Sequence, residues 1–442
     1  MNTKILFALA IVIVGLSSCR STRSNDTATV ADPIGGGDGL FISYPPEEEE
    51  IPNNDAMTTE TVQFSNMLEN MNSFSLEFFR KLSNNNSSES IAFSPASLNM
   101  AMAIVYSGAR EETRQQISSL FGFAPQPSVF HPAYHAYFSE LMEIRKDTLV
   151  DFNLANRVFL EQSYPVLPQY KSDVEKWHDG AFEKTDFRNN PRLAENRINS
   201  WVEDLTRDRI KDLIPSGSLS DLTRLVLVNA IYIKSDWKFP FEKEMTEEKM
   251  FRTISGEEVL RDFMIQRQNG IPWYEGEDFT AMELPYTTPN LSLILIKPND
   301  KSVTDITRYI PDVNTYNQMI REFRQEDVEM EIPSFKLETA LSLSEPLREA
   351  GIEEAFDERA DFSGISGERD LHISDVLQKV FFEIDEKGSE AAAATAVIVV
   401  TTSMPADPPD FQPKSFVADR PFIFILKENK FNTPLFTGQI VK

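Results

Sequence analysis

The sequence predicts an α+β protein whose sheets are mostly antiparallel. Segments with the three- and four-residue apolar spacing of amphipathic helices crowd the first half of the 442-residue chain, and β-branched or apolar runs crowd the second half. No stretch repeats at a fixed period, and helices do not alternate with strands as they would in a doubly wound parallel sheet. The hydrophobic fraction of 41% is ample for a large core, and we expect one folded domain over residues 62–442.

The net charge and the residue counts exclude several function classes. The chain has 43 lysines and arginines against 69 aspartates and glutamates, a formal net charge of −26, so no nucleic-acid partner is expected. The single cysteine excludes an intrachain disulfide and a cysteine-based zinc site. The four histidines are His131, His135, His178 and His372. Pro132 stands between the first two and no glutamate is adjacent, so neither a metal site nor a cofactor is expected.

Residues 1–18 have the pattern of an export signal. Lys4 precedes an apolar run over residues 5–15, which is too short to span a bilayer stably and is followed by Leu16-Ser17-Ser18-Cys19. This last motif resembles the lipobox that bacterial lipoprotein signals carry, so Cys19 is expected to bear the lipid. The alternative is an ordinary signal peptide with an incidental cysteine. We therefore expect an exported protein, lipid-anchored to the bacterial cell envelope on the periplasmic side or the outer surface, or else extracellular.

Residues 19–61 are interpreted as a flexible tether. They are poor in large apolar residues and contain Gly35-Gly36-Gly37, Pro45-Pro46 and four glutamates at 47–50. Such a composition cannot bury enough surface to offset the entropy of ordering. We expect the tether to hold the domain away from a membrane, and the glutamate run to be a solvated linker rather than a calcium site.

The helices and strands of the domain are expected in the following order. A long amphipathic helix over residues 64–82 ends at Asn84-Asn85-Asn86. Further helices are predicted at 96–107, 112–121, 135–145, 168–177, 193–207 and 344–350. Strands are predicted at 153–160, 225–233, 291–296, 328–332, 379–384, 421–426 and 435–441.

Residues 385–400 change from helix-forming to strand-forming composition within one run. One interpretation is a buried helix that continues into a strand. A second interpretation is a strand, in which side chains alternate between two faces. If Glu390 faces water, then Ser389, Ala391, Ala393 and Thr395 face inward, followed by Val at 397 and 399. Small residues at the start suit late insertion between two strands. Residues 401–416 are rich in Pro, Asp and Thr and are typical of an exposed loop, which suggests two states of one chain.

Motifs along the whole domain resemble those of one family. The stretch 386–395 resembles the hinge of the serpins, the serine-protease inhibitor family, and Phe416-Val417-Ala418-Asp419-Arg420-Pro421-Phe422 opens a stretch similar to the family's C-terminal signature. Further matches are Phe93-Ser94-Pro95-Ala96-Ser97, Asn156-Arg157-Val158-Phe159, Ile198-Asn199-Ser200-Trp201-Val202, Ile210-Lys211-Asp212-Leu213-Ile214, the run 227–234 with Trp237, and Asp361-Phe362-Ser363-Gly364-Ile365. The similarity covers about residues 62–442.

The resemblance implies a serpin-like single domain with three mostly antiparallel β-sheets, eight or nine helices and an exposed reactive loop. It implies a suicide inhibitor of serine endopeptidases, with cysteine endopeptidases as further candidates. The protease cuts the loop and becomes acylated on its own nucleophile, and the freed hinge inserts into the large sheet. The protein is then not an enzyme but a monomer whose partner is the target endopeptidase, held covalently.

The resemblance also assigns the site residues. The hinge comprises Glu386, Gly388, Ser389, Ala391, Ala393 and Thr395. Counting about fourteen residues beyond the hinge glycine places the reactive bond at Thr402–Ser403, with Thr401–Thr402 as the other register; proline at 405 disfavours cleavage at the preceding bond. A threonine after three small or β-branched residues suits elastase-like or subtilisin-like proteases with shallow pockets.

The sequence departs from the family pattern at two positions. The sheet-opening cluster, Ser94, Ser97 and Asn229, usually includes a histidine, and Gln378 stands in that place. An amide can bridge the same donors and acceptors, so we expect a cluster without pH dependence. Family members often pair the hinge glutamate with a lysine after a proline, whereas here Pro333 is followed by Ser334.

Two rival functions are weaker. An enzyme is disfavoured because the chain has no Gly-x-Ser-x-Gly elbow, no phosphate loop and no His-Glu-x-x-His motif. A non-inhibitory serpin-fold binding protein is the alternative, but its hinge would typically carry bulky, charged or proline residues, and the alanines at 391–394 are permissive.

Overall fold

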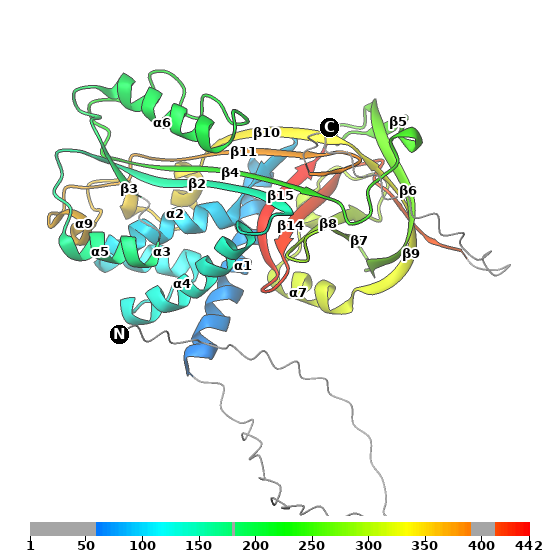
Figure 1. The fold of residues 1–442 in the computed structure, drawn as a ribbon, viewed down its shortest axis with the longest axis horizontal. Coiled ribbons are helices and arrows are strands. Elements are labelled where there is room, and N and C mark those ends of the chain that lie inside the picture. Colours follow the sequence, from blue (N-terminus) through cyan, green and yellow to red (C-terminus); the bar gives the residue numbers. More distant parts are fainter. Residues whose placement is uncertain (1–58, 179–181, 390–411) are drawn as a thin grey trace, which may run out of the picture. The chain divides into compact units, whose positions relative to one another are not determined.

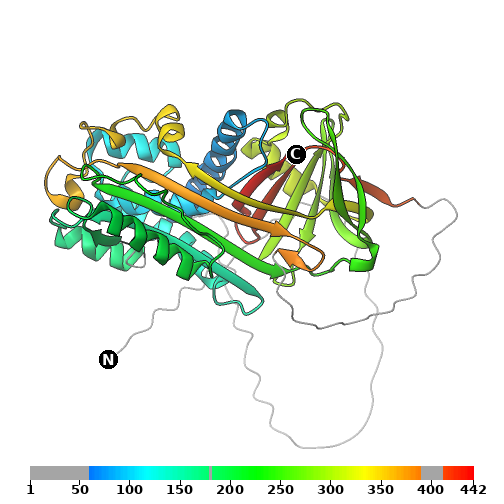
Figure 2. The ribbon, with the colours of Figure 1, turned by 90° about the horizontal axis from the view of Figure 1, so that it is seen from above.

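Two hydrogen-bonded sheets organise the chain in the computed structural model, which describes residues 59–178, 182–389 and 412–442. These residues belong to one unit, Met57–Lys442. The six-stranded sheet has the order β10 (Phe335–Ser342), β11 (Asp375–Ile384), β12 (Gly388–Ser389), β4 (Leu225–Asp236), β2 (Val150–Glu161) and β3 (Phe182–Thr185). Figure 2 shows its long strands running side by side.

The second sheet has nine strands and contains the C-terminus. Its order is β1 (Ile91–Phe93), β15 (Thr433–Ile440), β14 (Phe422–Glu428), β8 (Leu291–Pro298), β7 (Phe279–Pro285), β6 (Glu258–Glu275), β9 (Arg324–Pro333) and β13 (Lys414–Val417), and β5 (Glu247–Arg252) pairs with β6. The first part of β6 pairs with β5 and β9, and its last three residues pair with β7. The strand therefore joins two smaller sheets into one network, which with the six-stranded sheet makes the three expected.

Nine α-helices occur in the described part of the chain. They are α1 (Thr59–Asn85), α2 (Pro95–Gly108), α3 (Glu111–Phe121), α4 (Pro127–Ile144), α5 (Pro168–Trp177), α6 (Pro191–Leu205), α7 (Val313–Glu322), α8 (Ser344–Glu349) and α9 (Ser363–Ser366). Three short 3₁₀ helices are η1 (Lys243–Met245), η2 (Thr307–Tyr309) and η3 (Glu354–Phe356). The α+β fold class and the expected number of helices are confirmed.

The six-stranded sheet separates two hydrophobic cores, because successive residues of a strand point to opposite faces. On β4, Leu227 and Ile231 belong to the main core, on the side of α2. Val226 and Val228 face the other way and pack in a smaller core with α6. Figure 1 shows α6 alone on that face and α2 on the other. Both faces of the central strands are therefore covered.

Several sequence predictions were incomplete. The helix predicted at 135–145 begins eight residues earlier, at Pro127, because Pro132 is tolerated inside α4. The missing hydrogen bond at that proline is offset by burial of Phe130 and Tyr134. Strand β6 was not predicted, since its polar, mixed sequence contains Gly270 and Pro272 at an irregularity of its pairing with β9. Strands β1, β3, β5, β7, β10 and β13 and helices α7 and α9 were missed as well.

No helix among the described residues is long and apolar enough to cross a bilayer.

Candidate functional site: the hinge and the gap between two strands

Strands β4 and β11 are joined at one end and parted at the other. Asp375–Val380 of β11 pair directly with Val226–Ile231 of β4, parallel to each other. Beyond these pairs β12 lies between the two strands and runs antiparallel to both: Gly388 and Ser389 oppose Asp236 and Ser235, and Ser389 also opposes Ile384. The start of the predicted hinge is therefore already a short strand of the large sheet.

Gly388 lies against the backbone of β4. A Cβ added at this glycine would collide with the carbonyl oxygen of Ser235 and lie 2.7 Å from the Cα of Asp236. Only a residue without a side chain allows this approach. The hinge glycine is thus required by contact in the uncut protein.

The hinge turn is held by two aromatic residues. Trp237 donates from its backbone N–H to the carbonyl of Lys387 at 2.7 Å and from Nε1 to the carbonyl of Asp385 at 2.9 Å. Its ring stacks on Tyr286, with 4.5 Å between centroids. The Tyr286 hydroxyl lies 2.5 Å from the Oγ of Ser389, which is 1% exposed. Burial raises the pKa of Tyr286 above its usual value, so this contact joins two neutral hydroxyls.

Glu386 caps the hinge with a neutral partner. Its carboxylate accepts a hydrogen bond of 2.8 Å from the Oγ1 of Thr246, and its carbonyl accepts one of 2.8 Å from the N–H of Phe241. A cavity of about 540 Å³ beside it is lined by Lys243, Lys336 and Ser334, among others. Among the described residues no ion pair reaches Glu386. Ser334, which follows Pro333, lines this cavity and donates its backbone N–H to the carbonyl of Asp262 at 2.8 Å.

The four residues of the expected sheet-opening cluster lie together at the joined end. Gln378 accepts from the N–H of Ser94 and donates to the carbonyl of the same residue, both at 2.9 Å. The Oγ of Ser97 donates to Oδ1 of Asn156 at 2.6 Å and is 3.4 Å from Oδ1 of Asn229. Ser94, Ser97, Asn229 and Gln378 are all 0% exposed. A buried polar network of this kind is stable only because its members are paired.

Three amides of this cluster form a row across the sheet. Asn156 of β2 is opposite Asn229 of β4, and Asn229 is opposite Gln378 of β11. The row joins the three strands where β4 and β11 meet directly. Ser94, at the start of α2, ties the row to the main core through its Oγ, which donates to the carbonyl of Leu435 at 2.7 Å. Separating β4 from β11 here requires this polar contact to be remade.

The sequence analysis missed three residues of the site, and several of the residues that it predicted lie outside the described part of the chain. Asn156, Thr246 and Tyr286 were not identified as site residues; for Asn156 the signal was its place in a quoted family motif. Tyr286 and Thr246 are 103 and 140 positions from their hinge partners, and no local pattern reports such a contact. Several predicted residues lie outside the described part of the chain: Cys19, Ala391, Ala393, Thr395, Thr401, Thr402 and Ser403.

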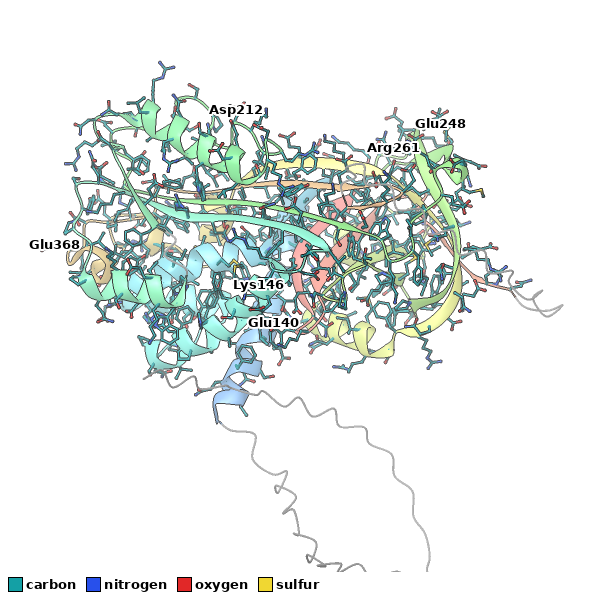
Figure 3. All side chains as sticks on the ribbon, viewed as in Figure 1. Glu140, Lys146, Asp212, Glu248, Arg261 and Glu368 are labelled. Atoms are coloured by element: carbon teal, nitrogen blue, oxygen red, sulfur yellow. The ribbon has the colours of Figure 1, made fainter. Side chains whose placement is uncertain are left out.

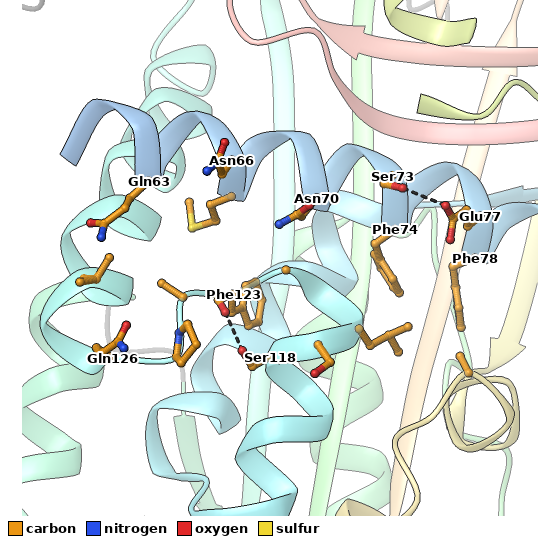
Figure 4. Close-up of a pocket in the computed structure, with 18 of the residues that line it drawn as sticks. Gln63, Asn66, Asn70, Ser73, Phe74, Glu77, Phe78, Ser118, Phe123 and Gln126 are labelled. Atoms are coloured by element: carbon orange, nitrogen blue, oxygen red, sulfur yellow. Dashed lines mark hydrogen bonds between the residues drawn. The ribbon is translucent and has the colours of Figure 1, made fainter. Parts of the chain in front are cut away.

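Polar groupings also occur elsewhere in the described part of the chain. Among the described residues no three histidine, cysteine or acidic side chains are placed to bind a metal ion. His178 is 3% exposed, its Nε2 lies 3.1 Å from the Oγ of Ser107, and burial lowers its pKa to about 3. A cavity of about 760 Å³ lies along α1 and the end of α3, lined by amides such as Asn66, Asn70 and Gln126 (Figure 4). None of the hinge or cluster residues lines it.

Comparisons with known proteins agree with this arrangement. The family model described as "Serpin (serine protease inhibitor)" matches residues 69–442. An uncharacterized serpin-like protein of Methanosarcina mazei is 35% identical over 353 residues, 80% of this chain and 81% of its own length. The leukocyte elastase inhibitor of Xenopus tropicalis is 33% identical over 390 residues, 84% of this chain and 99% of its own.

A solved structure shows the same fold. The crystal structure of Serpin48, a highly specific serpin of the insect Tenebrio molitor, superposes with a TM-score of 0.74 at 26% identity. The similarity covers 87% of this chain and 99% of that one. The chain belongs to the serpin family.

Proposed function

We propose that the protein is a suicide inhibitor of serine endopeptidases, with cysteine endopeptidases as further candidates, that traps the acyl-enzyme by inserting its cut loop between β4 and β11. The observation that supports this most directly is the position of β12. Its two residues pair with β4 on one side and β11 on the other, which is the position where an inserted strand would begin. Serpin loop insertion is itself a standard example of strand addition that releases stored strain.

The pairing of β12 with β4 and its pairing with β11 predict the same position for a longer strand. Continuing the pairing of Ser389 with Ser235 places Thr395 opposite Asn229. Continuing the pairing of Ser389 with Ile384 places Thr395 opposite Gln378, the residue already opposite Asn229. A strand extended from β12 would therefore bring a threonine hydroxyl into the amide row, where a purely apolar residue would leave buried polar groups unpaired.

The hinge residues predicted to face inward would lie on the side of the sheet that faces the main core. Ser389 faces the main core, so Ala391 and Ala393 would follow it there, opposite Ile233 and Ile231. Small side chains enter a packed core with little displacement of their neighbours. Extending the strand from Ser389 to Thr402 at about 3.3 Å per residue would carry the attached protease roughly 45 Å. Distortion of its oxyanion hole would then stop deacylation.

We place the reactive bond at Thr402–Ser403, with Thr401–Thr402 as the other register. Small and β-branched residues before the bond favour elastase-like or subtilisin-like targets. Discrimination by such side chains is weak, about one or two orders of magnitude per group, so a broad target range is expected.

The deciding experiment mixes the protein with an elastase-like protease. The expected result is an SDS-stable complex, with mass spectrometry placing the new acyl bond at Thr402 or Thr401. A cut loop with full protease activity and no covalent complex would instead indicate a non-inhibitory serpin-fold protein.

We also propose that the mature chain begins at a lipidated Cys19 and is anchored to the bacterial cell envelope through the tether 19–61. The support is the order of residues 1–19 and the single cysteine of the chain. Replacing Cys19 with alanine should move the protein from the membrane fraction to the soluble or unprocessed fraction. Unchanged membrane partitioning of this variant would contradict the anchor.

A further inference from the structure

An apolar surface is exposed on the hairpin of β5 and β6 and at the end of η1, just before it. Met245, Met250 and Leu260 are 49%, 54% and 54% exposed, three of the seven large hydrophobic side chains exposed in the described part of the chain. Met250 is directly opposite Leu260, so the two side chains share one face of the hairpin. Phe251, the next residue along β5, points to the other face and is 0% exposed. The outward face therefore carries apolar residues where polar ones would be expected.

Two like charges border this surface. Glu248 is directly opposite Asp262, two residue pairs along from Met250 and Leu260 and therefore on the same outward face. Both carboxylates are exposed, and neither forms an ion pair with any residue that the structure describes. Like charges directly opposite each other on neighbouring strands destabilise the pair. We name Met245, Glu248, Met250, Leu260 and Asp262 the hairpin patch.

The hairpin patch lies beside the hinge. Thr246, which binds Glu386 of the hinge, is the residue between Met245 and β5. Asp262 and Glu386 line the same cavity. On its other edge β6 pairs with β9, which pairs with β13, the strand that begins at Lys414 after the loop. The hinge, at Glu386, is thus next to this hairpin, whereas Lys414 is opposite Val328, which is opposite Gln268 farther along β6. Figure 3 shows Glu248 and Arg261 at the same end of the domain.

We infer that the hairpin patch is a second docking surface for the target protease, and that the target carries basic side chains around an apolar spot next to its cleft. The inference rests on the proposed function. A lysine or arginine of the protease would relieve the repulsion between Glu248 and Asp262, and Met250 with Leu260 would supply apolar contact. A second copy of this chain fits poorly, because its net charge is −26 and it would present the same carboxylates.

The hairpin patch would add discrimination between proteases that the loop sequence does not provide. Threonine and valine side chains before the reactive bond discriminate weakly between proteases with shallow pockets. Complementary charge raises the rate of encounter and depends on ionic strength. A cationic target would therefore be captured faster than an acidic protease that accepts the same loop.

The test measures association rate constants for matched variants. Glu248→Lys is compared with Glu368→Lys, which makes the same charge change at the opposite end of the domain (Figure 3). Leu260→Ser is compared with Leu193→Ser, which removes an exposed leucine from α6. With a cationic elastase-like protease in about 0.05 M salt, Glu248→Lys is expected to be about tenfold slower than Glu368→Lys, and the gap should close at about 0.5 M salt. Leu260→Ser should be slower than Leu193→Ser at both salt concentrations.

The outcomes separate this inference from the inhibitory function. Equal rates for Glu248→Lys and Glu368→Lys, with covalent complexes still formed at the parent stoichiometry, would overturn the docking surface and leave inhibition intact. A dimer of the parent that Leu260→Ser dissociates and Leu193→Ser does not would overturn it in favour of a second copy. Absence of any covalent complex with the parent would overturn both proposals.

Discussion

The two ends of the space between β4 and β11 are held in different ways. At the joined end six residue pairs connect the strands directly, and a buried amide row ties them to the start of α2. At the open end Gly388 and Ser389, the last described residues before the loop, lie between the strands and are held by Trp237 and Tyr286. The comparison shows that a buried, fully paired polar cluster can close one part of a sheet while a small hinge keeps another part open.

The largest effect is expected from a charge introduced next to the open end. Ala391→Arg would force an unpaired cation into the main core on insertion, at a cost of several kcal/mol as an order of magnitude. Insertion competes with deacylation, so the variant should be cut and release active protease. Its stoichiometry of inhibition with an elastase-like protease is the measurement.

The control for this prediction is Glu390→Arg. Continuing the observed register places residue 390 opposite Lys234, a half-exposed residue on the other face of β4. This variant should retain much more inhibition than Ala391→Arg. Two variants that inhibit as well as the parent would contradict strand insertion.

A change at the joined end should act on stability first. Gln378→Ala removes both hydrogen bonds to the backbone of Ser94, which leaves its buried N–H unpaired and its carbonyl with only the 3.3 Å bond from the N–H of Leu98. The expected loss in free energy of unfolding is about 3 kcal/mol, measured by urea denaturation. Gln318→Ala on the exposed side of α7 is the matched control and should change it by about 0.5 kcal/mol or less. Equal losses in the two variants would mean that the amide row does not hold the strands together.

Acid is expected to lower the free energy of unfolding through His178, which is not among the residues of the space between β4 and β11. Burial lowers the pKa of His178 to about 3 from its usual 6.5. The unfolded chain binds this proton more readily, so stability falls as the pH drops below about 6.5 and continues to fall toward 3. At pH 5 the loss is about 2 kcal/mol relative to neutral pH, measured by urea unfolding at both values.

The effect of acid is expected at His178 and not at the amide row. His178→Gln should remove most of this pH dependence, whereas the amide row has no titrating member because glutamine occupies position 378. If the parent kept its full stability at pH 5, the assignment to His178 would be wrong.

The smallest effect is expected at the hinge contact itself. Tyr286→Phe keeps the stacking on Trp237 but removes the hydroxyl that contacts Ser389, a loss of about 1 kcal/mol. Amide hydrogen exchange at Gly388 and Ser389 should accelerate about fivefold. Tyr274→Phe, on the half-exposed side of β6, serves as the control and should leave exchange at these two amides unchanged. Equal exchange in both variants would show that the hydroxyl contact does not hold the hinge.

The sequence was sufficient where a local period or a family motif carried the information. Period two placed Ser389 inward, and the structure buries it, because alternation is a property of the extended backbone. The family motifs pointed to Ser94, Ser97, Asn229 and Gln378, which lie together. The reach of Tyr286 to Ser389 depends on how two sheets meet, and no spacing within one segment encodes it.

Strand β6 shows the same limit for the fold. Its outward face carries Leu260 and Asp262 and its inward face Phe263, so neither a helical nor a clean alternating pattern emerges. The strand forms because β5, β7 and β9 all pair with it. Pairing partners distant in sequence thus outweigh local propensity.

The two paired residues of β12 have a kinetic consequence. Starting a new strand normally requires a loop to close and its first hydrogen bonds to form before any further contact repays the entropy. In the uncut protein this nucleus already exists, because Gly388 and Ser389 are bonded to β4. After cleavage the chain would only have to elongate, one residue pair at a time and in one direction, from an edge that is already seated. The rate of trapping would then be set by how fast six pairs between β4 and β11 give way, not by a search for the starting position.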